Sequence, residues 1–203
     1  MVRSATLAAL LLVCTGCAET TSGAGAPSST LGPAARSSAP AMTTLGYAFA
    51  PPGFYPFCEA QPALCSTDGE ADPMAMTPSR KAELQIINRT VNHAFKQRDD
   101  EQGLIGDHWE LPTAASGGDC EDLAILKKAE LLKRGWPAST LLLTVGTLKG
   151  AGHAVLTVRT SEGDLVLDNR TDAIKIWSRT PYTFFARQKA NAGGGSEWAR
   201  IES

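Results

Sequence analysis

Three residues have the types and the order of a catalytic triad built on a thiol. Cys120 is followed 33 residues later by His153, and Asp168 lies 15 residues beyond the histidine. A thiol nucleophile, an imidazole base and a carboxylate that orients the imidazole can together form and hydrolyse a thioester. Taken singly, each has an ordinary alternative: a small buried hydrophobe, a core or surface histidine, and a strand-end carboxylate bonded to backbone. The pattern therefore predicts catalysis only if the fold brings the three side chains together.

Acidic residues flank the thiol. Asp119, Glu121 and Asp122 surround Cys120 in the sequence, and like charge raises the pKa of a thiol. A Ca²⁺ ion bound by oxygens of this cluster would remove this conflict and hold the long loop against the helix, with backbone carbonyls and water completing its ligands. The alternative is that these acids only cap a helix. With 3 His in the whole chain and no Cys/His cluster at ligand spacing, a zinc site is not expected.

The thiol is predicted to begin a helix. Residues from about 120 to 134 are expected to be helical, with Asp119 as the N-cap and Gly135 after the last turn. A helix N-terminus lowers a thiol pKa and offers backbone N–H groups to an oxyanion. Residues 99–118 lack periodicity and are rich in Gly, which predicts a long functional loop. An amphipathic helix is expected over residues 78 to about 98.

The histidine and the aspartate are predicted to lie on a β-hairpin. Strands are expected at residues 140–147, 153–160, 164–169 and 173–177. With the turn at residues 161–163, the residue numbers of cross-strand partners add up to between about 321 and 325. Side chains alternate along a strand, so only an odd sum places His153 and Asp168 on one face. An even register would separate them.

The first residues have the layout of an export signal. Arg3 precedes an apolar run at residues 7–13, and Gly16 with Cys17 follows. Residues 1–17 are expected to be a signal peptide of one of two kinds. In the lipoprotein kind, Cys17 is lipidated and anchors the protein to a membrane in the periplasm; in the plain kind, the protein is simply exported.

A change of composition separates a tether from the folded domain. Residues 18–45 are mostly Ala, Ser, Thr, Gly and Pro, so a flexible tether is expected there and an ordered domain over residues 46–203. The formal net charge of −2, without a long basic block, argues against nucleic acid as a partner. The one apolar run is too short for a permanent membrane span, which excludes a multispan membrane protein.

The five cysteines suit an oxidising compartment. Cys14 leaves with the signal and Cys17 carries the lipid. Cys58 and Cys65 lie seven residues apart, close enough to form a disulfide across a small loop. Cys120 has no partner left. An unpaired thiol in such a compartment is either a buried bystander or a residue in use.

Several segments resemble the bacterial transglutaminase-like cysteine proteinases. The matching segments are residues 118–124 (GDCEDLA), 131–137 (LLKRGWP), Gly152 with His153, and 167–169 (LDN), together with Cys58 and Cys65, Asp107 with Trp109, and Tyr182 to Gln188. The resemblance covers about residues 50–190. It implies an α+β, papain-like or transglutaminase-like fold with the thiol at the start of a central helix packed on an antiparallel sheet. It also implies that Cys120, His153 and Asp168 form the triad and that Asp119 and Glu121 bind Ca²⁺.

The resemblance also implies a role. The characterised branch of the family trims the N-terminal retention region of a surface adhesin in the periplasm, after a pair of alanines, and thereby controls biofilm. A protein substrate is therefore implied, with a surface adhesin as the candidate. The implied regulator is an inner-membrane cyclic-di-GMP receptor that sequesters the protease.

Three functions stay open on the residues alone. In the first, a cysteine endopeptidase, water captures a thioester formed on Cys120. In the second, a transglutaminase or amidase, an amine captures the same thioester, and no motif distinguishes the two. The third is a non-catalytic periplasmic lipoprotein that keeps the fold as a binding module.

Overall fold

The computed structural model describes residues 41–70, 72–98, 107–191 and 197–202, which lie within the compact unit Ser37–Ser203. The expected signal peptide, Cys17 and almost all of the expected tether lie outside the described residues. Residues 99–106 of the long loop also lie outside them. Within the described ranges, no helix has both the length and the apolar character needed to cross a bilayer.

The described part of the chain is an α+β domain built on an antiparallel sheet of order β1-β7-β6-β2-β3-β4-β5. Its strands are β1 (Thr44–Ala48), β2 (Leu141–Leu148), β3 (Ala151–Thr160), β4 (Gly163–Asp168), β5 (Thr171–Ile176), β6 (Thr183–Gln188) and β7 (Trp198–Ile201). Its helices are α1 (Phe54–Ala60), α2 (Pro62–Cys65), α3 (Pro78–Ala94) and α4 (Cys120–Lys133). The expected fold class is confirmed.

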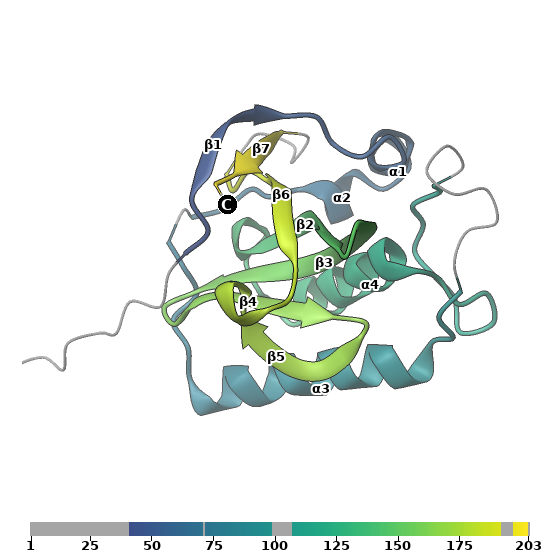
Figure 1. Ribbon diagram of the computed structural model, residues 1–203. Helices are drawn as coiled ribbons and strands as arrows, with labels where there is room; N and C mark the ends of the chain where they lie inside the picture. The colour runs from purple at the N-terminus through teal and green to yellow at the C-terminus, as the bar shows by residue number, and fades with distance from the viewer. Residues whose placement is uncertain (1–40, 71, 99–106, 192–196, 203) are drawn as a thin grey trace, which may run out of the picture. The chain divides into compact units, whose positions relative to one another are not determined.

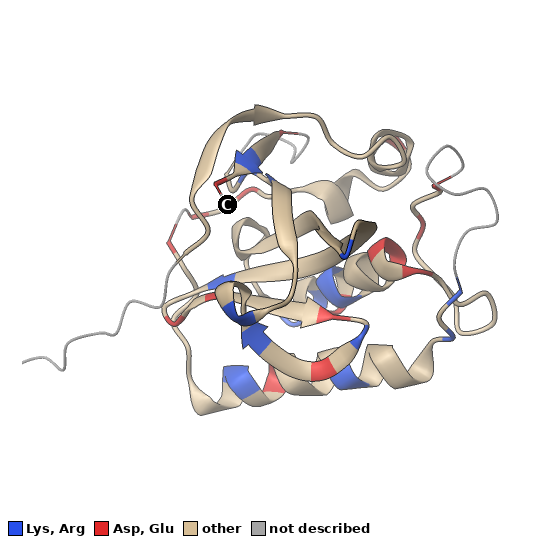
Figure 2. Ribbon diagram, viewed as in Figure 1, with Lys and Arg blue, Asp and Glu red and all other residues tan. Residues whose placement is uncertain are grey.

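Helix α4 is the central helix of the domain. It packs on β3, and α3 lies against both α4 and β5 (Figure 1). Apolar residues of α3, α4 and the inner face of the sheet form the main core, among them Leu84, Ile87, Leu123, Leu131, Leu143 and Leu156. Even Lys127 and Lys128 of α4 are buried. Charged residues of both signs lie on α3 and β5, and acidic residues lie at the start of α4 (Figure 2).

The β3–β4 hairpin has the register that the triad requires. Leu156 pairs with Leu167 and Val158 pairs with Leu165, so the partners' numbers add to an odd value. His153 and Asp168 therefore lie on the same face of the sheet, because side chains alternate along each strand. The sequence left both registers open, and the odd one is found.

Helix α3 ends at Ala94, about four residues before the predicted end. Beyond it, the backbone turns to bridge the segment that precedes the thiol: Gly118 N donates to Lys96 O at 3.1 Å, and Arg98 N donates to Gly118 O at 3.0 Å. These long-range bonds replace the last helical turn, and local periodicity gives no sign of them.

Ordered structure begins earlier in the chain than the sequence predicts. Met42 is buried, and its backbone N–H donates to Asp164 at 2.9 Å, so order begins before residue 46. At the other end, the chain forms β7, which pairs with β1 and β6 and buries Trp198 completely. Both ends are ordered by partners far away in the sequence, which composition does not reveal.

The predicted disulfide is confirmed. Cys58 of α1 and Cys65 of α2 are bonded, with Cα atoms 5.6 Å apart. Within the described residues, Cys120 is the free cysteine.

Candidate active site

Two glycines let the chain turn into α4 at Cys120. Gly117 has φ +70°, and a Cβ on it would lie 2.2 Å from the carbonyl oxygen of Lys96. A Cβ on Gly118 would lie 2.6 Å from a carboxylate oxygen of Asp122, and that carboxylate accepts the backbone N–H of Glu110 at 2.8 Å. The Gly-Gly-Asp-Cys segment therefore fits closely between α3 and the loop before α4, which fixes the place of the thiol.

The structure brings the three predicted catalytic residues together. Cys120 is the first residue of α4, and its Sγ accepts the backbone N–H of Ala154 at 3.3 Å, directly beside His153. The Nε2 of His153 lies 3.0 Å from Oδ1 of Asp168, and both side chains are buried. Because an ionised carboxylate only accepts hydrogen bonds, Nε2 carries the proton and Nδ1 is the acceptor nitrogen of the ring. The Cys120 thiol itself donates to Oε2 of Glu121 at 3.2 Å.

Tyr182 contacts both partners of that pair. Its ring lies 4.8 Å from the His153 ring, centroid to centroid, at an interplanar angle of 34°. Its hydroxyl donates a short hydrogen bond to Oδ2 of Asp168. Burial alone raises the pKa of Asp168, but hydrogen bonds from His153, Tyr182 and the Arg170 amide outweigh burial and hold this pKa below its usual value. Asp168 is therefore ionised at neutral pH.

Amide side chains of α3 hold the turn that carries Asp168. Asn92 Nδ2 donates to the backbone oxygens of Asp168 at 3.0 Å and of Thr171 at 3.1 Å. Asn88 Nδ2 donates to Thr171 O at 3.0 Å. The position of the carboxylate is thus set by α3 as well as by the hairpin. Sequence reasoning had assigned no role at the site to Asn88 or Asn92, since nothing in their spacing points to it.

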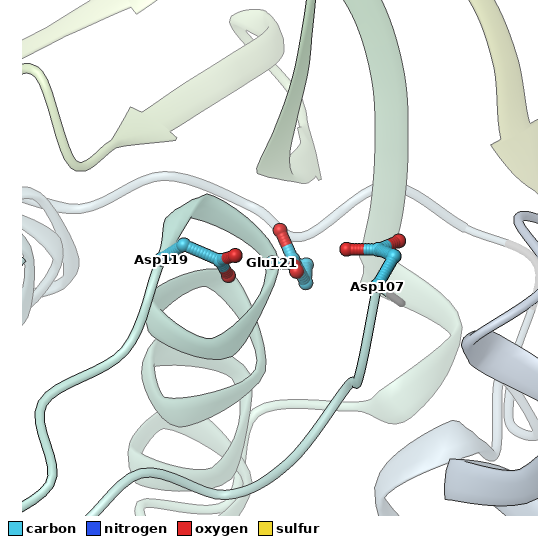
Figure 3. Close-up of side chains that lie close together, drawn as sticks. All are labelled: Asp107, Asp119 and Glu121. Atoms are coloured by element: carbon cyan, nitrogen blue, oxygen red, sulfur yellow. The ribbon is translucent and has the colours of Figure 1, made fainter. Parts of the chain in front are cut away.

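Three carboxylates meet beside the thiol. Asp107, Asp119 and Glu121 each offer an oxygen, and these oxygens lie within 4.8 Å of one another (Figure 3). Asp119 and Glu121 were the predicted pair. Asp107 was missed as a ligand candidate because it lies 12 residues before Asp119, in a loop with no periodic signal. Its Oδ2 accepts the Nε1 proton of the buried Trp109 at 2.9 Å, which anchors the acid at this place.

The charge at this cluster is unbalanced. Burial, then hydrogen bonds and repulsion from Asp119 and Asp107, raises the pKa of Glu121. Its Oε1 is buried without a hydrogen-bond partner among the described residues. Burial and the Glu121 charge also raise the pKa of the Cys120 thiol, although the Ala154 N–H acts in the opposite direction. An oxygen-lined group with surplus negative charge suits a hard divalent cation such as Ca²⁺.

Cys120, Gly152 and His153 lie between two hollows. One hollow, of about 500 Å³, is polar and is also lined by Gln97, Asn169 and Arg170. The other, of about 540 Å³, has mostly apolar neighbours, namely Phe49, Ala50, Pro51, Pro52, Trp109, Val145, Ala154 and Phe185, beside the three acids. A substrate segment lying across the thiol would meet both.

Comparison with known proteins gives a consistent result. Residues 44–203 match the model of a family described as bacterial transglutaminase-like cysteine proteinase. The structure is similar to calcium-bound Legionella pneumophila LapG, with 29% identity and a TM-score of 0.51 over 61% of this chain and 72% of that chain.

Two further structures of the same Legionella protein match less closely. One has 29% identity and a TM-score of 0.47, over 53% of this chain and 63% of that chain. The other, EGTA-treated, has 28% identity and a TM-score of 0.47, over 53% of this chain and 62% of that chain. No curated protein matches the chain.

Proposed function

Because the chain belongs to the bacterial transglutaminase-like cysteine proteinases and is a cysteine peptidase, we propose that Cys120, His153 and Asp168 are its catalytic triad and that it is an endopeptidase. The observation that carries this proposal is the meeting of the three groups at the start of α4. Cys120 Sγ contacts the backbone next to His153, and His153 Nε2 lies 3.0 Å from Asp168.

The proposed reaction follows from these contacts. Nδ1 of His153 takes the proton of Cys120, and the sulfur attacks the carbonyl carbon of a peptide bond. The imidazolium then protonates the leaving amine, which leaves a thioester on Cys120. Water, deprotonated by the same imidazole, hydrolyses the thioester and releases the new carboxyl end. Asp168 holds the ring orientation throughout, and the N-terminus of α4 favours the anionic sulfur and oxygen.

The acid cluster is proposed to bind Ca²⁺ through Asp107, Asp119 and Glu121. The donor chemistry and the unpaired Oε1 of Glu121 support this assignment. So does the likeness to LapG, which was solved in a calcium-bound form. When bound, the ion would supply positive charge that lowers the pKa of Cys120 and ties residues 107–109 to α4.

The site of action is proposed to be the periplasm, with the chain held at a membrane by lipid on Cys17. The layout of residues 1–17 supports export, and the Cys58–Cys65 disulfide suits an oxidising compartment. An exported protein is then the substrate, with a surface adhesin as the candidate. The candidate regulator is an inner-membrane cyclic-di-GMP receptor. Both candidates rest on the family resemblance.

A digest of the host's exported proteins tests the function. The purified chain is added with Ca²⁺ or with EGTA, and mass spectrometry detects new N-termini and cross-links. If the chain is a hydrolase, the wild type should produce new N-termini in Ca²⁺. Cys120→Ala and His153→Ala should produce none, and His93→Ala should cleave like the wild type. His93 is the matched control because it is an exposed histidine paired with Asp172. Cross-links without chain scission would identify a transferase, and cleavage by Cys120→Ala would refute the triad.

A further inference from the structure

The apolar hollow beside Cys120 opens between two exposed aromatic side chains. Phe49, which follows β1, is 79% exposed, and Phe185 of β6 is 51% exposed. Both line the hollow together with the thiol. Large apolar groups left in water around a cavity of several hundred Å³ are typical of a binding site.

Rigid elements build the hollow. Pro51 and Pro52 form one part of its lining, where Phe54 N donates to Pro51 O at 3.0 Å as the chain enters α1. Val145 of β2 and Phe185 of the neighbouring strand β6 form another. The pairing of β6 with β2 is irregular here, since Val145 pairs with Ala186 and Gly146 with Phe184. Phe184 is buried in the second core cluster, whereas Phe185, at the irregularity, is exposed. The cavity is therefore largely formed before a substrate arrives.

The thiol end of the hollow is open. Gly152, which precedes His153, lines both hollows, and a Cβ added to it would meet nothing within 4 Å. An extended chain can therefore pass over Gly152 and place neighbouring side chains in the two hollows. The polar hollow is lined by Gln97, Asn169 and Arg170, so it does not offer a comparable apolar surface to a substrate side chain.

We propose that the apolar hollow is a specificity subsite for a large apolar side chain flanking the scissile bond. Its volume of about 540 Å³ exceeds what a methyl group fills, so it accommodates a side chain larger than alanine. In this respect the preferred bond of this chain departs from the pair of alanines that the family resemblance implies. Phe49 and Phe185 are its specificity residues. This subsite rests on the proposed function, because the thiol beside it must be the nucleophile.

Alkylation of Cys120 measures the subsite without any known substrate. The full chain, in Ca²⁺, is treated with iodoacetamide, with N-benzyl iodoacetamide and with an aminoethyl analogue that carries an ammonium group. Peptide mass spectrometry gives the rate at Cys120, and each rate is divided by the rate of the same reagent with glutathione. Since all reagents meet the same thiol, the ratios report binding beside the sulfur and not its ionisation.

The benzyl reagent is expected to react about tenfold faster than iodoacetamide, because its ring leaves water on binding. Phe185→Ser and Phe49→Ser should each reduce that preference by about threefold or more. Ile86→Ser is the matched control, since Ile86 is 59% exposed on α3 and lines a different hollow. Both aromatic side chains are largely in solvent, so their loss is expected to leave the fold intact, which melting curves check.

The outcomes separate the two proposals. A wild-type preference near one, a preference unchanged by both Phe substitutions, or a stronger preference for the ammonium reagent would each overturn the subsite. A benzyl preference that depends on Phe49 and Phe185 supports it. If that preference is present but no exported protein is cleaved, the hollow still binds apolar groups and the endopeptidase proposal is what fails.

Discussion

Replacing Asp107 by Asn is predicted to have opposite effects in the presence and absence of calcium. Without the ion, the substitution removes a repelling charge and should stabilise the fold. With the ion, it removes a ligand and should weaken binding. Asn retains a carbonyl oxygen that can accept the Nε1 proton of Trp109, now 2.9 Å from Asp107, so the change removes charge and leaves the contact. Asp107 is the acid that sequence reasoning missed, which makes this a stringent test.

The size of the effect follows from the cluster geometry. Two unit charges 4.8 Å apart, the separation within which these oxygens lie, repel by about 3 kcal/mol at an effective dielectric constant of about 20. Asp107 and Asp119 are two such charges, so without an ion the substitution removes their mutual repulsion. Both are partly exposed and screened, which leaves about 1–2 kcal/mol. For a chain of this size, that corresponds to a rise in Tm of about 3–6 °C in EGTA.

Thermal melts with and without Ca²⁺ measure both effects on the same samples. We expect Asp107→Asn to melt higher than wild type in EGTA and to need at least about a hundredfold more Ca²⁺ for the same stabilisation. Asp172→Asn is the control, because Asp172 is an exposed carboxylate on β5, outside the cluster. A lower Tm in EGTA together with an unchanged calcium response would refute the assignment of Asp107 to the cation site.

Three further predictions concern other residues. Tyr182→Phe keeps the ring on His153 but removes the hydrogen bond to Asp168. It should therefore raise the pKa of Asp168 and shift the acid limb of the pH–rate profile to higher pH. Tyr182→Leu also removes the ring, so it should in addition lower kcat by about tenfold or more. Gly152→Leu should leave the Tm near wild type, because its Cβ meets nothing within 4 Å, and should raise KM in peptide assays by at least about tenfold by obstructing both hollows. Burial lowers the pKa of Lys128 from an ordinary 10.5 to about 7. Between about pH 7 and 10.5 the unfolded chain therefore carries a proton on Lys128 that the folded chain lacks, so stability should rise with pH over this range. Lys128→Met should melt higher than wild type at pH 7 and should flatten that rise.

The meeting of Cys120, His153 and Asp168 could be predicted in part because two of its determinants are local. The N-terminus of α4 follows from the residues around Asp119, and the hairpin turn leaves few registers for His153 and Asp168. Whether the residue numbers of cross-strand partners add to an odd or an even value then decides whether His153 and Asp168 lie on the same face. The same reasoning predicted the Cys58–Cys65 bond from a spacing of seven residues.

The rest of the site depends on contacts that are distant in sequence. Asp107 reaches the thiol because its loop docks on Asp122, and Tyr182 reaches Asp168 across the sheet. The strands β1 and β7 exist because they pair with each other across the whole domain. Phe49 lies in water at the mouth of a hollow whose other residues come from distant parts of the chain. Composition and periodicity cannot supply such pairings.

The reactivity of Cys120 toward iodoacetamide at pH 6 tests the central claim most directly. In Ca²⁺, the wild-type thiol should react at least about tenfold faster than a free thiol, because His153 and the start of α4 keep it ionised below its ordinary pKa. The advantage should be lost with His153→Ala or in EGTA and kept with His93→Ala. A wild-type rate in Ca²⁺ equal to that of a free thiol, or one unchanged by His153→Ala, would contradict the account.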